Sequence, residues 1–432
     1  MTPATVIRSF AIGSLIFLYV VLTCASLAAV AIVYRTFHIE FDPDLVAAPM
    51  PFIGLVAAAG MLFAFARFSF GYAVSFYLYS TVLGFVWLSY FTKFEYDHDT
   101  ARVSAVASLL AFMIPALFLR SGIRQRFIVP PDKIEFLLFV ILLISAATIA
   151  VCSLYGFGLP DDFEGMYQLR EEMAFPFVLN YLAGTCISVL LPFSLACCIE
   201  LKRWTAALIA ILLSVAFYPI ALSKLALFAP FWIVFLAGLS RFLSARLATI
   251  FSLLAPMLLG LFSLAYAGEA PATYLFGMIN FRMLAIPASA IDHYNDFFGS
   301  APLTYFCQVS WLKGIVGCPY KDPLPVIFSD LYHVGNYNAS MIATEGIASL
   351  GNYGAPFSLF CCGLLIALGN RLSAGLPDRF VLLSSGIILQ VLMNVGLTTA
   401  LLTHGLGLLF VLWYILPRTF DQSGKGRARL EP

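Results

Sequence analysis

The sequence predicts an all-α protein that crosses a membrane many times. Hydrophobic residues make up 61% of the 432 residues, charged residues only 11%, and the mean hydropathy is +0.94. Soluble domains carry about 25% charged residues, so this composition excludes an ordinary soluble protein. Apolar runs recur along the whole chain, which indicates a polytopic protein. The net charge of +1, with no basic patch, gives no support for a nucleic-acid partner.

A helix that crosses a bilayer needs about 20 mostly apolar residues. On this criterion we expect about 12 transmembrane helices. They lie near residues 10–33, 46–66, 70–92, 103–119, 134–155, 174–199, 204–222, 225–240, 247–266, 353–370, 380–397 and 399–416. The first apolar run is too long for a cleavable signal peptide, and YRTFHIEFDPD follows it instead of a cleavage site, so we interpret it as a span.

These spans divide the chain into four regions. The first nine spans occupy residues 1–266, a large polar segment follows over 267–352, the last three spans occupy 353–418, and 419–432 form a tail. Loops this long are uncommon unless they are functional, so we take the polar segment to be the working part. Its apolar and aromatic residues are spaced for short helices that lie along the membrane surface.

The distribution of charge predicts the orientation. Cytoplasmic loops carry an excess of Lys and Arg, and most basic residues of the short loops here fall on one side. The acidic clusters fall on the other side, at Glu40, Asp42 and Asp44, at Glu95, Asp97 and Asp99, and at residues 161–172. Both termini are therefore expected in the cytoplasm, and residues 267–352 are expected to face outward.

The sequence offers few candidates for a disulfide or for a metal site. Most of the nine cysteines fall in or beside spans, where cysteine behaves as a small buried apolar residue. Cys307 and Cys318 lie in the outward segment, where an oxidising compartment would permit a disulfide; two free thiols are the alternative. Asp97 and Asp99 could bind a divalent metal together with Glu95. An acidic outer loop explains the same residues, and we predict no metal site and no cofactor.

Basic residues at the edges of spans are candidates for binding an anion, because charges in or near a membrane are expensive and tend to mark function. Lys224 lies in a tight turn, where a lysine reaching the lipid headgroups is the alternative. Arg170 precedes a span, and Glu171 and Glu172 beside it offer ion pairs instead. Arg282 lies in the first part of the polar segment, and an arginine fork can hold a diphosphate through two hydrogen bonds.

Candidate proton acceptors lie in the same segment. His333 has an unperturbed pKa near working pH, and Asp330 could orient it if this stretch is helical. A histidine that is only hydrogen-bonded is the alternative, and His293 beside Asp292 is a weaker version of the pair. Glu345 is either a structural capping or pairing residue or the catalytic carboxylate, and the sequence leaves both open.

Three stretches resemble bacterial Wzy-type polymerases of O-antigen, a part of lipopolysaccharide, and of related polysaccharides. They are ALSKLALF at a turn between spans, NFRMLAIPASAIDHYNDFF at the start of the polar segment, and YNASMIATEGIASLGNYGAP at its end. The last stretch has an Asn-rich turn, a small-residue helix and Gly-x-x-Gly leading into a span. The resemblance covers the whole chain in topology and a smaller part of it in recognisable motifs.

This resemblance implies a metal-independent, GT-C-like glycosyltransferase of the bacterial inner membrane with its active site facing the periplasm. The donor would be a growing glycan on undecaprenyl diphosphate, and the acceptor a lipid-linked repeat unit. A chain-length regulator and a flippase would be its protein partners. Membrane lipid would surround it, and no cofactor is implied.

The resemblance also assigns roles to residues. Arg282, Lys224 and Arg170 would bind the diphosphate. His333, oriented by Asp330, or Glu345 would be the catalytic base. Residues that would contact sugars, or else sit at the membrane interface, are Tyr294, Tyr332 and Tyr337, together with Tyr305 and Trp311.

Three other functions stay open. An O-antigen ligase would use the same donor and similar basic residues, and would differ only in its acceptor. A flippase or transporter of lipid-linked glycan would need polar residues along the middle of the spans, and those stretches are nearly free of charge. A metal-dependent glycosyltransferase would use Asp97 and Asp99.

Overall fold

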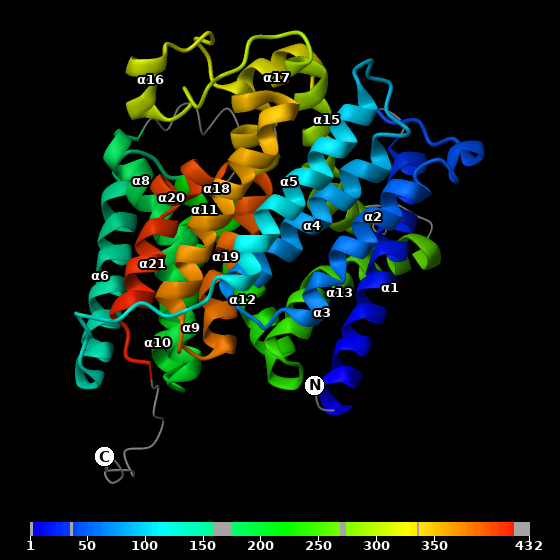
Figure 1. Cartoon of the computed structure of the whole chain (residues 1–432). Helices are drawn as coiled ribbons and strands as arrows, with labels where there is room; N and C mark the ends of the chain where they lie inside the picture. The colour runs from blue at the N-terminus through cyan, green and yellow to red at the C-terminus, as the bar shows by residue number, and fades with distance from the viewer. Residues whose placement is uncertain (1–2, 35–37, 159–174, 268–273, 335–336, 419–432) are drawn as a thin grey trace. The chain divides into compact units, whose positions relative to one another are not determined.

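A computed structural model of the chain describes residues 3–34, 38–158, 175–267, 274–334 and 337–418 (Figure 1). Over these residues the protein is all-helical, with an isolated bridge between Ile39 and Thr92 in place of any sheet. Ten helices in the described part are long and apolar enough to cross a membrane. They are Ser9–Val33, Phe70–Leu88, His98–Phe118, Pro131–Cys152, Phe177–Glu200, Trp204–Ala221, Lys224–Phe242, Ala245–Tyr266, Tyr274–Phe298 and Ile342–Ser373. The protein is a polytopic membrane protein by this measure.

The helices differ from the expected spans where the backbone is interrupted. Predicted span 46–66 is two short helices, α2 (Met50–Gly60) and α3 (Leu62–Phe65). Predicted span 399–416 is divided because Gly405 has a left-handed φ of 77°. It separates α20 (Leu397–Leu402) from α21 (Leu406–Ile415).

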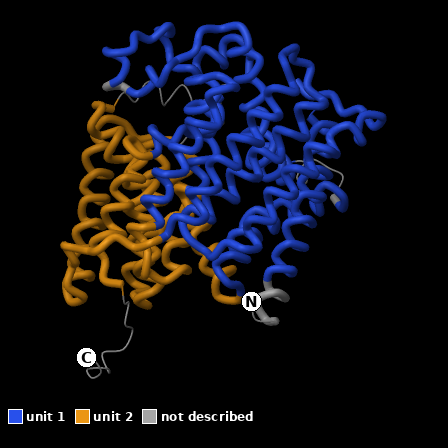
Figure 2. The backbone as a smooth tube through the Cα atoms, viewed as in Figure 1, with its two compact units in different colours: residues 1–120, 243–370, 389–400 blue, residues 121–242, 371–388, 401–432 orange. Residues whose placement is uncertain are grey.

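The chain forms two compact units (Figure 2). Unit 1 contains residues 1–120, 243–370 and 389–400, and unit 2 contains residues 121–242, 371–388 and 401–432. Unit 1 includes α1 (Pro3–Val33), α2, α3, α4 (Phe70–Leu88), α5 (His98–Phe118), α13 (Ala245–Ala267), the π-helix η4 (Gly277–Ala285), α15 (Ile286–Phe298), α16 (Ser310–Val316), α17 (Leu324–Tyr332) and the π-helix η5 (Ile342–Ala348).

Unit 2 includes α6 (Ile134–Cys152), α8 (Phe177–Thr185), the π-helix η3 (Cys186–Leu190), α9 (Leu191–Glu200), α10 (Trp204–Ala216), α11 (Tyr218–Ala221), α12 (Lys224–Phe242) and α21. The helices α18 (Ser349–Ser373), α19 (Asp378–Asn394) and α20 contain boundaries between the units. The helix α6 exposes large apolar side chains such as Phe136 and Leu143, as expected of a helix that faces lipid.

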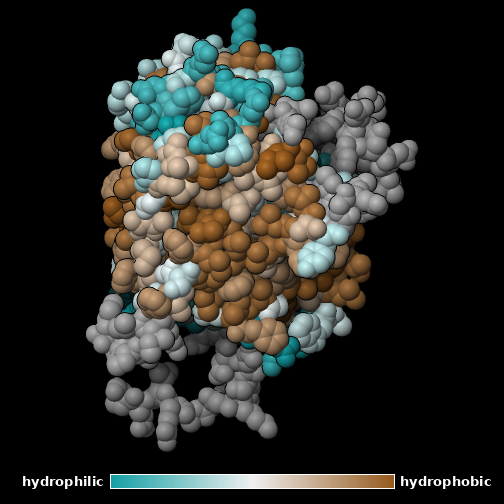
Figure 3. All heavy atoms as spheres, turned by 90° about the vertical axis from the view of Figure 1, so that its right-hand side faces the viewer, coloured by the Kyte–Doolittle hydropathy of each residue, from teal (hydrophilic) through white to brown (hydrophobic). Residues whose placement is uncertain are grey.

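On the face drawn in Figure 3, hydrophobic side chains form a broad region and hydrophilic ones gather at one end.

Unit 1 is built around α4, in which every residue from Phe70 to Leu88 is buried. A helix that is apolar all round is typically a core helix. It runs in the same direction as α1, because the Tyr19 and Ser80 hydroxyls are 2.5 Å apart. Further along both helices, Gly84 approaches Leu27. The ends of α1 and α4 at Val33 and Leu88 therefore lie at the same end of unit 1.

The polar segment starts at this end of unit 1 and returns to it. Gly277 in η4 approaches Tyr34, directly after α1. The carboxylate of Asp292 in α15 accepts a hydrogen bond from Thr92, directly after α4, at 2.5 Å. The helix over 274–298 is long and apolar enough to cross a membrane, and it packs alongside the interiors of other helices: Asn280 donates to Ser26 in α1 and to the Met257 carbonyl in α13, and Ala288 approaches Gly84 in α4. We call this end of unit 1, which holds Tyr34, Thr92 and the polar segment, the polar end.

At the opposite end, Asn370 joins three helices of unit 1. Its Oδ1 accepts from the backbone N–H of Gly71 in the first turn of α4 at 2.6 Å. Its Nδ2 donates to the carbonyls of Ala116 and Leu119, where α5 ends, at 2.7 and 3.2 Å. Helix ends leave such backbone groups without partners inside the helix, so one amide satisfies two helix termini.

We predict that Asn370→Leu destabilises the protein by about 2–5 kcal/mol, because it leaves buried backbone groups without hydrogen bonds. The melting temperature of the full chain in detergent measures the effect. The exposed residue Asn338 provides the matched control, and Asn338→Leu should leave the melting temperature nearly unchanged. Equal melting temperatures for both variants would contradict the role given to Asn370.

Candidate functional site

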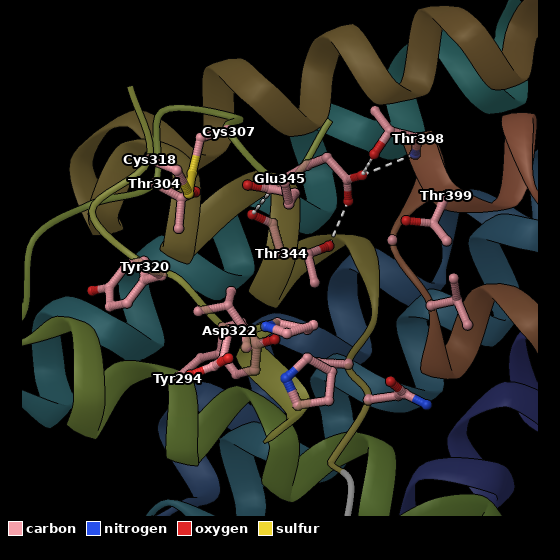
Figure 4. A pocket seen from close by; sticks show the side chains of 18 of the residues that line it. Tyr294, Thr304, Cys307, Cys318, Tyr320, Asp322, Thr344, Glu345, Thr398 and Thr399 are labelled. Carbon is pink, nitrogen blue, oxygen red and sulfur yellow. Dashed lines mark hydrogen bonds between the residues drawn. A yellow bond between two sulfur atoms is a disulfide. The ribbon is translucent and has the colours of Figure 1, made fainter. Parts of the chain in front are cut away.

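A pocket of about 430 Å³ lies at the polar end of unit 1 (Figure 4). Its walls come from α15, from the stretch between Thr304 and Pro325, from residues before and within η5, and from the connection after α19. We call it the Glu345 pocket. Its polar lining residues are Tyr294, Thr304, Gln308, Lys313, Tyr320, Lys321, Asp322, Asn338, Thr344, Glu345, Asn394, Thr398 and Thr399. The size and mixed lining suit a small-molecule group.

Glu345 is the buried charged group of this pocket, with 2% of its surface exposed. Its Oε1 accepts from the backbone N–H and the hydroxyl of Thr398 at 2.9 and 2.7 Å. Its Oε2 accepts from the Thr344 hydroxyl at 2.6 Å. A carboxylate offers about four acceptor positions, so three donors leave about one for a ligand. No ion pair to Glu345 occurs among the described residues.

Backbone features place Glu345 and Thr398 close together. Glu345 lies in the π-helix η5, and π-helical turns often occur at functional sites. A Cβ added at Gly396 would lie 2.8 Å from Oε1 of Glu345 and 2.7 Å from the Thr344 hydroxyl. Glycine is therefore required at 396 for the connection after α19 to approach the carboxylate this closely.

Two lysines give the pocket its positive charge. Lys313 lies in α16, and Lys321 follows this helix; both are exposed, line the pocket, and form no ion pair with a described residue. A disulfide joins Cys307 to Cys318, the pair considered from the sequence, and both cysteines line the pocket (Figure 4). It closes the loop that carries α16, which limits the positions open to Lys313.

The structure brings only some of the expected site residues together. Glu345 and Tyr294 line the same pocket. Arg282 is exposed on η4 and does not line it. Lys224 is the first residue of α12 in unit 2, so it belongs to the other compact unit. Arg170 lies outside the described residues.

The expected pairing of Asp330 with His333 does not form. The helix α17 ends at Tyr332, because His333 has a left-handed φ of 55°, so the two side chains do not share a helical face. Both residues are exposed, neither lines the Glu345 pocket, and no hydrogen bond joins them in the described part of the chain.

Tyr305, Tyr332 and Tyr337 do not line the Glu345 pocket. Tyr337 is buried, and its hydroxyl is hydrogen-bonded to the hydroxyl of Ser289 in α15. Tyr337 therefore packs against this helix. Tyr332 donates to Asp296 at 2.7 Å and lines a different pocket. Tyr305 is 55% exposed, and Trp311 lies in α16.

Sequence reasoning gave little weight to a cluster of buried groups around α15. The ring of His293 packs against His38, Phe94 and Tyr332. Asp292 accepts from Thr92 and Tyr96. The signal was the spacing of Asp292 and Asp296, which places both carboxylates on one helical face.

Burial shifts the pKa values of titratable groups in this cluster. Burial lowers the pKa of His38 because it disfavours the imidazolium. Burial raises the pKa of Tyr96, and the neighbouring Asp292 carboxylate adds to the rise. The pKa of Tyr332 is raised by burial first and by Asp296 second. These groups therefore stay neutral near pH 7.

The acidic residues considered as metal ligands have structural partners. Asp97 caps α5 by accepting from the backbone N–H of Thr100 at 3.1 Å. Asp99 forms an ion pair with Arg102 at 3.0 Å. Among the residues that the structure describes, no group of three or more His, Cys, Asp or Glu is arranged to hold a metal ion.

Unit 2 has a pocket of its own, of about 600 Å³. The described residues that line it include no lysine, arginine or carboxylate. His404 is its titratable imidazole, with Nδ1 3.4 Å from the Ser188 hydroxyl. The Glu345 pocket has both charges and proton acceptors, so it is the stronger candidate for chemistry.

Comparison with family models, with curated proteins and with solved structures returned no match for this chain.

We predict that Gly396→Ala lowers stability by about 1–3 kcal/mol, because the added methyl overlaps Glu345 and Thr344. Gly314→Ala is the matched control, since a Cβ at Gly314 meets no atom within 4 Å. The melting temperature of the full chain in detergent should fall for the first variant only. An unchanged melting temperature for Gly396→Ala would mean that the carboxylate is not packed as described.

Proposed function

We propose that this chain is a glycosyltransferase that joins lipid-diphosphate-linked saccharides, with the Glu345 pocket as its active site. The observation that carries the proposal is a buried carboxylate sharing a pocket with two lysines, at the polar end of an apolar helical unit. A lipid-linked substrate needs this combination, because its tail stays in the membrane while its diphosphate and sugars reach a polar site. The resemblance to Wzy-type polymerases supports the same reaction.

The proposed reaction is a substitution at the anomeric carbon of the donor sugar. A hydroxyl of the acceptor attacks this carbon, the bond to the phosphate oxygen breaks, and the lipid diphosphate leaves with the electron pair. Glu345 takes the proton of the attacking hydroxyl through its remaining acceptor position. The donors from Thr398 and Thr344 hold the carboxylate in place for this step.

Lys313 and Lys321 bind the diphosphate in this proposal. Positive charge fixed where the leaving group gains negative charge lowers the barrier for its departure. The sequence pointed to Arg282 for this role, but Arg282 does not line the Glu345 pocket. Among the residues that the structure describes, Lys313 and Lys321 are the cations that line this pocket.

At the finer level we propose a polymerase of undecaprenyl-diphosphate-linked repeat units in a bacterial inner membrane. The polar end would face the periplasm and both termini the cytoplasm. The growing glycan is the donor, and one lipid-linked repeat unit is the acceptor. A chain-length regulator and a flippase are the partner proteins that this reaction implies.

We predict that Glu345→Gln lowers polymerisation about 10²- to 10⁴-fold, because it removes the proton acceptor and keeps the size of the side chain. A gel of surface polysaccharide from cells that carry only this variant should show core capped by a single repeat unit. His333→Ala is the comparator and should keep the full ladder.

The same gel separates the other functions. Bare core with accumulated long lipid-linked polymer would identify a ligase. Bare core with single lipid-linked units retained inside would identify a flippase. A full ladder with the Glu345 variant would remove Glu345 from the mechanism, and loss of the ladder with His333→Ala alone would transfer the role of base to His333.

We predict that replacing both Lys313 and Lys321 by alanine weakens donor binding at least tenfold, because hydrogen bonds to charged groups contribute about 1.5–3 kcal/mol each. The KM for lipid-linked donor, measured with purified protein in detergent, reports the change. Arg282→Ala should leave this KM unaltered. The opposite pattern would return the phosphate-binding role to Arg282.

A further inference from the structure

An open pocket of about 570 Å³ lies in unit 2 at the start of α6, and we call it the Arg126 pocket. Its cations are Arg126 and Lys133. The other described residues that line it are apolar, and none of them carries a carboxylate. They come from the stretch before α6, from the first two turns of α6 and from the last residue of α21.

The stretch before α6 is fixed against the end of α21 by hydrogen bonds. The backbone N–H of Val129 donates to the Ile415 carbonyl at 2.8 Å. The backbone N–H of Arg126 donates to the Tyr414 hydroxyl at 2.8 Å. The side-chain amide of Gln125 donates to carbonyls of the same segment. The protein therefore holds this wall of the pocket in place without an occupant.

Large apolar side chains are exposed at the pocket. Phe127 is 73% exposed, Ile128 52% and Phe136 65%. Exposed apolar surface costs free energy in water, and contact with hydrocarbon removes that cost. The candidate membrane span Pro131–Cys152 begins at this point, so the pocket lies where hydrocarbon and lipid headgroups meet. Lipid is therefore the cover that fits these side chains.

Arg126 and Lys133 require that this lipid be anionic. Both side chains are exposed, and neither forms an ion pair with a described residue. Glu135, the next carboxylate along the chain, is paired with Arg203, and Asp132 does not line the pocket. A phosphate placed between two cations gains charge-assisted hydrogen bonds, and an arginine fork can bind two of its oxygens.

We propose that the Arg126 pocket binds one anionic glycerophospholipid. Its phosphate lies on Arg126 and Lys133, and an acyl chain lies along Phe136, Leu137 and Val140. A molecule with an anionic head and an apolar tail matches a pocket that combines cations with apolar side chains at a membrane surface. The inference does not depend on the proposed function, because this pocket belongs to unit 2 and the Glu345 pocket to unit 1.

The test is native mass spectrometry of the full chain, delipidated in detergent and titrated with dioleoylphosphatidylglycerol. We expect one tightly bound lipid per chain. Replacing Arg126 and Lys133 together by glutamine should weaken its binding at least tenfold, because charge-assisted hydrogen bonds are lost. The matched control replaces Arg67 and Lys202, two exposed cations outside the pocket, by glutamine and should bind like the unmodified chain.

A second pair of variants tests the place of the acyl chain. Val140→Trp fills the apolar part of the pocket and should weaken lipid binding at least fivefold while both cations remain. Leu143→Trp adds the same ring at an exposed position of α6 outside the pocket, and it should leave lipid binding unchanged.

Several results would overturn the inference. Dioleoylphosphatidylcholine binding as tightly as the anionic lipid would do so, as would equal affinity in the two cation variants or in the two tryptophan variants. A rise in melting temperature with sodium phosphate alone, lost without Arg126 and Lys133, would replace the lipid by a free anion. A lipid-free dimer in the mass spectrum that Val140→Trp abolishes would replace it by a second copy of this chain.

Discussion

The buried carboxylate of Glu345 is the constraint on which the polar end of unit 1 depends. A charge buried without a counter-ion is stable only where donors satisfy it, and here the donors come from Thr344 and from Thr398. Because Thr398 follows α19 and Glu345 lies in η5, the carboxylate joins parts of the chain that are 53 residues apart. The glycine at 396 and the π-helical turn are the backbone consequences of this one requirement.

The need to give every buried polar group a hydrogen-bond partner also accounts for the interior of unit 1. In hydrocarbon, each backbone donor or acceptor that a helix leaves free must find a partner within the protein. Asn370 serves the ends of α4 and α5 in this way. Arg102 does so at the polar end, where it donates to the hydroxyl and carbonyl of Ser89 and lies 3.5 Å from the centre of the Tyr90 ring. A few polar side chains therefore set the positions of helices whose remaining surface is apolar.

Composition and hydropathy were sufficient to predict the fold class, because exclusion from water acts on every residue of a long apolar run. They assigned residues 274–298 to a polar segment, although this stretch forms a helix long and apolar enough to cross a membrane. Local spacing failed for Asp330 and His333, since one left-handed residue ended the helix. Glu345 was identified as a candidate, whereas Lys313 and Lys321 were not, because their place at the pocket depends on how the stretch around the Cys307–Cys318 disulfide folds.

The interleaving of the two units has a consequence for biosynthesis. Residues 121–242 emerge from the ribosome before unit 1 has received its second and third pieces, so unit 2 helices begin to insert while the Glu345 pocket has no walls. The pocket closes only when the stretch ending at Ala400 has been made, which ties assembly of the proposed active site to the last part of translation. A chain cut short before this stretch would insert many helices and still lack the two hydrogen bonds that Thr398 donates to Glu345.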